Sequence, residues 1–174
     1  MIKTKPVAFA LIYSILVIAF KLFVFYSGLQ MTKLGMYSHI LSLLIILPFV
    51  FVLIFLLRKE KGGDLSGKDA VKYALIFVSV SAIILSVFNY VFFENELKAY
   101  IANYIQTQGP KSILEEAAKK GQKISQEEID KMIKGGIEDL SAFKDTTSKL
   151  FSVFIFGVFS SFVSSIFLKR NTNE

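Results

Sequence analysis

The sequence predicts an all-α integral membrane protein: four transmembrane helices, with a small helical extracytoplasmic insert between the third and the fourth. Two observations support this prediction. Hydrophobic residues make up 53% of the 174 positions, and they are gathered in long runs. Four of these runs are long enough to cross a hydrocarbon core of about 30 Å as helices. The alternating ten-residue strands of a membrane barrel are absent from the sequence.

The predicted spans divide the chain into three regions: spans one to three in residues 1–93, the insert in 94–149, and the last span with a short tail in 150–174. Lys3 and Lys5 precede the first apolar run, as in a signal peptide. That run continues to Tyr26 without a small-residue cleavage site, which favours a retained helix. The four expected spans are residues 6–27, 37–57, 70–93 and 150–168.

An even number of crossings leaves both termini on one side of the membrane. That side collects cations at the N-terminus, in the loop RKEKGGDLSGKDA, and at Lys169 and Arg170. The positive-inside bias therefore predicts that both termini lie in the cytoplasm. The insert also carries many lysines, which dilutes this argument. The net charge of +6 suits anionic lipid head groups and requires no nucleic acid as a partner.

The insert is predicted to be helical. Apolar residues at three- and four-residue spacing from Leu97 to Ile105 predict an amphipathic helix. This helix either continues from the membrane or lies on its surface, and Gly109–Pro110 is expected to end it. Two more short helices should follow, each beginning with a capping box and ending at a glycine. The boxes are Ser112 with Glu115 and Ser125 with Glu128, and the glycines are Gly121 and Gly135.

The residues with catalytic potential do not form a recognisable reaction site. Glu127 and Glu128 are adjacent and point in different directions along a helix, whereas acid–base catalysis needs groups that converge. The chain has no cysteine, and His39 is its one histidine, so a typical zinc site is excluded. We therefore expect a protein that is not an enzyme and holds no metal or cofactor.

Polar residues inside the spans provide one candidate site. Lys21 lies in an apolar run, about 9 Å along the helix from Ser27, so its ammonium can extend to the membrane interface. Snorkelling of this kind is the favoured interpretation. The alternative is an intramembrane site in which Lys21 meets Glu94 and Asn89 at the outer end of the third span, as an ion pair or a ligand contact.

Two further features concern helix shape and packing. Pro48 lies in the middle of the second span and is expected to kink it. In the last span, Gly157, Ser161 and Ser165 recur every four residues, a spacing of small side chains that lets helices approach closely. The sequence leaves open whether the partner of this stripe is another helix of the chain or a different protein.

Four segments resemble a bacterial family of small membrane proteins known as domain of unknown function 4199. They are RKEKGGDLSGKDAVKYA, NYVFFENELKAYIANY, ISQEEIDKMI and LFSVFIFGVFSSFVSSIF. The resemblance covers most of the chain and implies four spans with the long insert before the last. It implies no catalytic residues. It also suggests one conceivable partner, a membrane-associated glycosyltransferase that handles lipid-linked sugars.

Two functions from different classes are compatible with these features. The first is a non-catalytic accessory or scaffolding subunit that packs against a partner membrane protein, or against further copies of itself, in the lipid bilayer. The small-residue stripe and the helical insert favour it. The alternative is a small carrier or a lipid- or anion-binding protein that uses Pro48 and the group of Lys21, Asn89 and Glu94.

Overall fold

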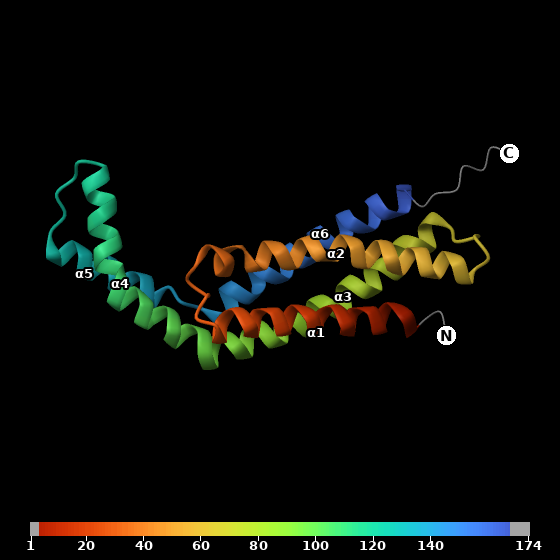
Figure 1. The fold of residues 1–174 in the computed structure, drawn as a ribbon, viewed down its shortest axis with the longest axis horizontal. Coiled ribbons are helices and arrows are strands. Elements are labelled where there is room, and N and C mark those ends of the chain that lie inside the picture. The colour runs from red at the N-terminus through yellow and green to blue at the C-terminus, as the bar shows by residue number, and fades with distance from the viewer. Residues whose placement is uncertain (1–3, 168–174) are drawn as a thin grey trace. The chain divides into compact units, whose positions relative to one another are not determined.

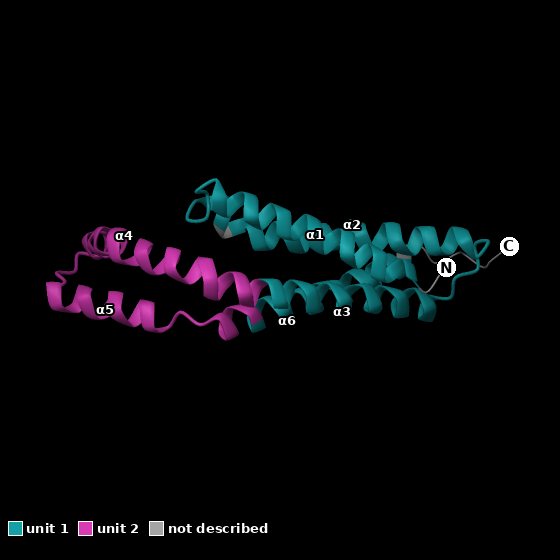
Figure 2. Ribbon diagram, turned by 90° about the horizontal axis from the view of Figure 1, so that it is seen from below, with its two compact units in different colours: residues 1–88, 147–174 teal, residues 89–146 magenta. Residues whose placement is uncertain are grey.

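The computed structural model describes residues 4–167, so Lys3, Lys169 and Arg170 of the predicted basic side lie outside the described residues. Within residues 4–167 every regular element is a helix and no strand is present, which confirms the all-α prediction. The chain divides into two compact units (Figure 2). One consists of residues 1–88 and 147–174, and the other of residues 89–146.

The first unit contains the predicted spans. It is built from α1 (Lys5–Tyr26), α2 (Lys33–Glu60), most of α3 (Gly67–Phe92) and most of α6 (Ala142–Phe167) (Figure 1). Each of these helices is long and apolar enough to cross a membrane, as the sequence predicted. Several helices extend beyond the predicted spans, because hydropathy detects the apolar middle of a helix while the helix itself continues into its polar ends.

Aromatic rings fill the centre of this unit. Tyr13 of α1 and Phe77 of α3 are both fully buried, with ring centroids 5.6 Å apart. Phe49 of α2 stacks on Phe77 at 6.3 Å. The Tyr13 hydroxyl donates a hydrogen bond of 2.9 Å to the backbone carbonyl of Ser42 in α2. Three helices are thus joined at one level by ring packing and by a buried hydrogen bond.

The outer faces of the same helices are apolar as well. Ile15, Ile83 and Ile155 are 63%, 62% and 65% exposed, on three different helices. A helix that is hydrophobic all round is typical of a membrane span, because lipid is as apolar as the protein interior. Large exposed apolar side chains on every span therefore identify the surface that faces hydrocarbon.

The second unit contains η2 (Phe93–Leu97, a π-helix), α4 (Lys98–Lys119) and α5 (Gln126–Glu138). The helical run that starts as α3 continues through η2 and α4 without a break, from Gly67 to Lys119. The amphipathic segment after the third span is therefore a direct continuation of that span. Within the unit, α4 and α5 lie side by side (Figure 2).

The prediction that Gly109–Pro110 ends a helix was wrong, because α4 runs through both residues. A proline inside a helix loses one backbone hydrogen bond, and packing offsets this loss here. A Cβ added at Gly109 would lie 3.6 Å from Cγ1 of Ile133, so the glycine sits where α5 packs on α4. The predicted capping box of Ser112 and Glu115 is consequently wrong too: Ser112 is inside the helix and donates to the carbonyl of Gln108 at 3.1 Å.

The remaining insert predictions had mixed outcomes. Gly121 follows the end of α4 with φ of 66°, a conformation that suits glycine, as expected. The Ser125–Glu128 box is confirmed: the Glu128 backbone N–H donates to Ser125 Oγ, and the Ser125 N–H donates to the Glu128 carboxylate. The prediction that Gly135 ends this helix was wrong, since α5 continues to Glu138. A glycine costs a helix only about 1 kcal/mol, which the packing of α5 outweighs.

Candidate functional site

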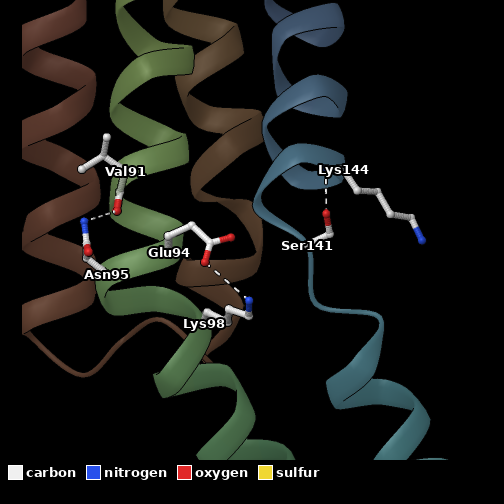
Figure 3. A network of polar contacts seen from close by, with 6 residues as sticks. All are labelled: Val91, Glu94, Asn95, Lys98, Ser141 and Lys144. Carbon is white, nitrogen blue, oxygen red and sulfur yellow. Dashed lines mark hydrogen bonds and ion pairs between the residues drawn. The ribbon is translucent and has the colours of Figure 1, made fainter.

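The predicted outer polar group includes Glu94, which lies in the π-helix η2. Lys98, one turn further on, donates to its carboxylate at 3.4 Å, and the two side chains are 44% and 40% exposed. Figure 3 shows Lys98 reaching back to Glu94, while Asn95 donates to the Val91 carbonyl at 2.9 Å. An exposed pair one turn apart contributes at most a few tenths of a kcal/mol. Glu94 therefore has a local partner that leaves part of its surface accessible.

A second contact in the same view belongs to the start of α6. The backbone N–H of Lys144 donates to Ser141 Oγ at 3.3 Å, and the Lys144 side chain points away from the other residues drawn (Figure 3). A serine hydroxyl that accepts from the backbone three residues on is the usual helix N-cap. This contact therefore positions the last span and leaves the lysine head group to the surface.

The other two members of the predicted group differ in environment. Asn89, near the end of α3, is 7% exposed, so its side-chain amide is buried inside the protein. Lys21, on α1, is half-buried. Lys21 belongs to the first compact unit, whereas Asn89 and Glu94 belong to the second. A shared site formed by the three residues therefore remains a prediction.

The π-helix itself was not anticipated from the sequence. Its five residues, FENEL, bury Phe93 and Leu97 and expose Glu94, Asn95 and Glu96. A π-turn contains one more residue than an α-turn, which rotates the side chains that follow, and such turns are frequent at functional sites. Apolar periodicity carries no signal for this distortion, since Phe93 and Leu97 keep the spacing of an ordinary α-helix. The geometry marks the segment as special without assigning it a chemistry.

The small-residue stripe of α6 packs inside the first unit. A Cβ added at Gly157 would lie 2.4 Å from Cγ2 of Val78, so α6 approaches α3 as closely as a glycine permits. The partner at this position is therefore another helix of the same chain. Ser161 is fully buried and its hydroxyl donates to the Gly157 carbonyl at 2.7 Å, whereas Ser165 is partly exposed. Ser164, not Ser165, occupies the next buried position.

Buried hydroxyls form a feature that the sequence analysis missed. Ser14 of α1, Ser81 of α3 and Ser164 of α6 are each 1% exposed, and their hydroxyls have no hydrogen-bond partner among residues 4–167. A serine in a membrane helix can rotate to share the carbonyl four residues earlier, which removes most of the cost. The spacing of serines in these three spans is the sequence signal that could have indicated this feature.

The end of the bundle that carries the α2–α3 loop is polar. Lys5 forms an ion pair with Glu60, which joins the start of α1 to the end of α2. Lys61 donates to Asp69 at 3.0 Å and lies 5.9 Å above the ring of Tyr73. The hydrogen bond to Asp69 raises the pKa of the Lys61 ammonium. These contacts fix the loop on the bundle at the boundary of the apolar region.

Pro48 lies inside α2, which continues on both sides of it, and its ring is on the exposed side of the helix. The next residue, Phe49, packs with Tyr13 at a centroid distance of 5.4 Å. The proline ring, and with it the position that lacks a backbone N–H donor, thus lies on the exposed side of α2 and not in the aromatic core. The kink expected at Pro48 remains a prediction.

No group of three or more His, Cys, Asp or Glu side chains within residues 4–167 is placed to hold a metal ion. The polar contacts described above are single pairs at helix ends. The arrangement provides apolar faces toward lipid, a close-packed glycine, and charged groups at the ends of the spans.

These features define a class, the integral membrane proteins built from a few apolar helices. The family model described as "Protein of unknown function (DUF4199)" matches residues 8–170, and the chain belongs to that family. The match confirms the resemblance found in the sequence. No curated protein and no solved structure gives a significant match.

Proposed function

We propose that this protein is a non-catalytic accessory subunit of a bacterial cytoplasmic membrane, which binds a partner membrane protein through its insert. The observation that carries the proposal is a notch of about 130 Å³ at the turn between α4 and α5. Ile113, Ala117, Ile124 and Met132 supply its apolar lining. Met132 is 55% exposed in this lining, and Leu114, the neighbour of Ile113 in the sequence of α4, is 49% exposed, although this unit lacks the all-round apolar surface of the spans.

The edge of the notch is polar. Lys120 donates to Glu116 at 2.6 Å, and both side chains are largely exposed. An apolar centre surrounded by charged and polar side chains is the usual anatomy of a protein–protein contact. Exposed leucine and methionine side chains on a charged helical hairpin favour the same interpretation, since exposed apolar side chains rimmed by polar residues are typical of interaction sites.

The proposed orientation places the α2–α3 loop in the cytoplasm together with both termini. Arg58, Lys59, Lys61, Lys68 and Lys72 lie in or next to that loop, and positive charge near span ends is typical of the cytoplasmic side. The insert and its notch are then extracytoplasmic. In this arrangement the notch meets the external part of a partner, for which a glycosyltransferase of lipid-linked sugars is one candidate class.

Affinity purification in a mild detergent tests this function. A tagged wild-type protein should retain a stoichiometric membrane protein, identified by mass spectrometry. The double variant Leu114→Ser/Met132→Ser should lose at least nine-tenths of that companion, because it removes two large exposed apolar side chains, one lining the notch and one next to Ile113 in α4. Tyr104→Ser is the matched control: it makes the same kind of change on α4, about 15 Å along the helix.

Three outcomes separate the alternatives. Loss of the companion in the double variant alone supports the proposal. Equal loss in the Tyr104 control, or purification of a protein without any companion, contradicts it. A wild-type protein that forms a dimer and a double variant that is monomeric, as measured by light scattering, would assign the notch to a second copy of the chain.

A carrier or an anion-binding protein is the second candidate, favoured by the burial of Asn89 within an apolar span. A protein that purifies alone, and whose Lys21→Met variant loses binding of an anionic solute or lipid, would favour this second function.

A further inference from the structure

A shallow groove runs along one face of α3. Its volume is about 510 Å³, and every residue that lines it belongs to α3. The floor is apolar and half-buried, formed by Val71, Leu75, Ile76 and Val80. This groove lies wholly within the first compact unit. It is distinct from the notch of the insert and from the predicted outer polar group.

The groove has the length of one membrane leaflet. From Lys68 at one end to Val80 at the other, twelve residue steps correspond to roughly 18 Å of helix. Half of a hydrocarbon core of about 30 Å is about 15 Å. The apolar floor therefore extends from the boundary of the membrane to near its middle, which is the reach of one phospholipid acyl chain.

The membrane-boundary end of the groove is positively charged. Lys68 and Lys72 both line it and both side chains are exposed. They are four residues apart, so they lie one above the other on one helix face, where two like charges repel. The carboxylate between them in the sequence, Asp69, is paired with Lys61 at 3.0 Å and also interacts electrostatically with Lys72, so it offsets only part of this charge. An anion placed between the two lysines would remove this repulsion.

The first turn of α3 adds to this charge. The helix begins at Gly67, and the Ser66 hydroxyl accepts a hydrogen bond from the Asp69 backbone N–H at 3.1 Å, so one of its first donors is already capped. Backbone N–H groups at a helix start favour a negative group nearby. The lysine pair and the first turn of α3 lie at the same end of the groove, next to its apolar floor.

We propose that this groove binds one anionic glycerophospholipid, with its phosphate at Lys68 and Lys72 and one acyl chain along Val71, Leu75, Ile76 and Val80. The small side chain of Ser79 leaves room near the far end of the groove. A helix of another protein fits the charge less well, because it would have to cover two like-charged ammonium groups without supplying an anion. The proposal does not depend on the accessory function.

Native mass spectrometry of the detergent-purified protein tests the site. Phosphatidylglycerol and phosphatidylcholine with identical acyl chains are added in turn, and bound lipid is counted. The wild type should retain phosphatidylglycerol about tenfold better than phosphatidylcholine. The variant Lys68→Gln/Lys72→Gln should lose this preference, since each lysine near a membrane surface contributes about fivefold in affinity for an anionic lipid.

Two further variants test whether the preference depends on this groove. Lys119→Gln/Lys123→Gln removes the same charge from exposed positions of the insert and should leave the preference unchanged. Ser79→Leu keeps both lysines and fills space in the groove, so it should lower retention of phosphatidylglycerol. Glycerol phosphate, the soluble head group without acyl chains, should show no comparable binding to the protein. Persistence of the preference in the Lys68/Lys72 variant overturns the proposal, as does equal loss in the Lys119/Lys123 control.

The same spectra report oligomeric state. A wild-type dimer that becomes a monomer on Ser79→Leu, with no change in lipid retention, would assign the groove to a second copy of the chain and overturn the lipid site. Retention of one phosphatidylglycerol per monomer in the wild type, lost in both groove variants and kept in the control, supports it.

Discussion

The two compact units are both helical, yet they are stabilised in different ways. In the first unit the spans are apolar on all sides, and what distinguishes the inside is tight packing: Gly157 against Val78, and Tyr13 between Phe49 and Phe77. In the second unit the helices are amphipathic and charged, with caps and ion pairs at their ends, such as Ser125 with Glu128. The surroundings explain the difference, because lipid provides no hydrophobic driving force between helices whereas water does.

The comparison predicts that the largest loss of stability comes from filling the close contact in the bundle. Gly157→Leu would place side-chain atoms within 2.4 Å of Val78, forcing α3 and α6 apart. We expect the free energy of unfolding in detergent to fall by about 3 kcal/mol, as measured by denaturant titration of helicity. Gly135→Leu is the control in the second unit: it has open space there and should be neutral or slightly stabilising.

Equal losses of stability for the two leucine substitutions would contradict the proposed difference between the units, because they would show that close packing matters no more in the bundle than in the insert. Restoration of stability in the double variant Gly157→Leu/Val78→Ala would assign the loss to this one contact, since the smaller partner relieves the same contact.

The buried hydrogen bond of the bundle should have the next largest effect. Tyr13→Phe removes the hydroxyl that donates to the Ser42 carbonyl at 2.9 Å and leaves that carbonyl one bond short. The expected loss is about 1–2 kcal/mol, since the group is buried away from water. Tyr26→Phe, at a tyrosine that is 72% exposed, should change the same unfolding measurement by less than about 0.5 kcal/mol.

The insert should instead respond to pH through its helix cap. Hydrogen bonds from the backbone and side chain of Ser125 lower the pKa of Glu128 below its usual value of 4.5. A lowered pKa means that the stabilisation is present above pH 4.5 and is lost as the pH falls through the lower, folded value. We expect hydrogen exchange of α5 to accelerate over that acidic range, while the spans stay protected.

Two variants check the cap. Glu128→Gln retains a capping side chain that does not titrate, so the acid-dependent part of the exchange should disappear. Ser125→Ala removes the cap at every pH and should cost about 1 kcal/mol of local stability in α5. An unchanged pH profile in Glu128→Gln would contradict the assignment.

The smallest effect is expected at the lysine inside the first span. If Lys21 extends its ammonium to the membrane interface, as the sequence favours, Lys21→Met keeps the apolar stem and should change the free energy of unfolding by less than about 0.5 kcal/mol. Leu16→Met on the same helix, 53% exposed, is the control for a methionine facing lipid. A loss above 2 kcal/mol for Lys21 would indicate an ion pair inside the bundle instead.

Much of the fold follows from the sequence alone, because a membrane span is a local property. A run of about 20 apolar residues must become a helix in lipid, where every backbone group needs an internal partner. The four spans and the cap at Ser125 are of this kind. The Ser125 box needed nothing beyond residues three positions apart.

Other features of the fold depend on tertiary structure, because they are set by what packs against a given residue. Gly109–Pro110 carries a strong local signal for a helix end, and α5 overrides it by packing Ile133 against the glycine. Which helix meets Gly157, and which serines are buried, depend on the rotation of each span in the bundle. Lipid-facing and core-facing residues are equally apolar here, so composition alone cannot tell the two faces apart.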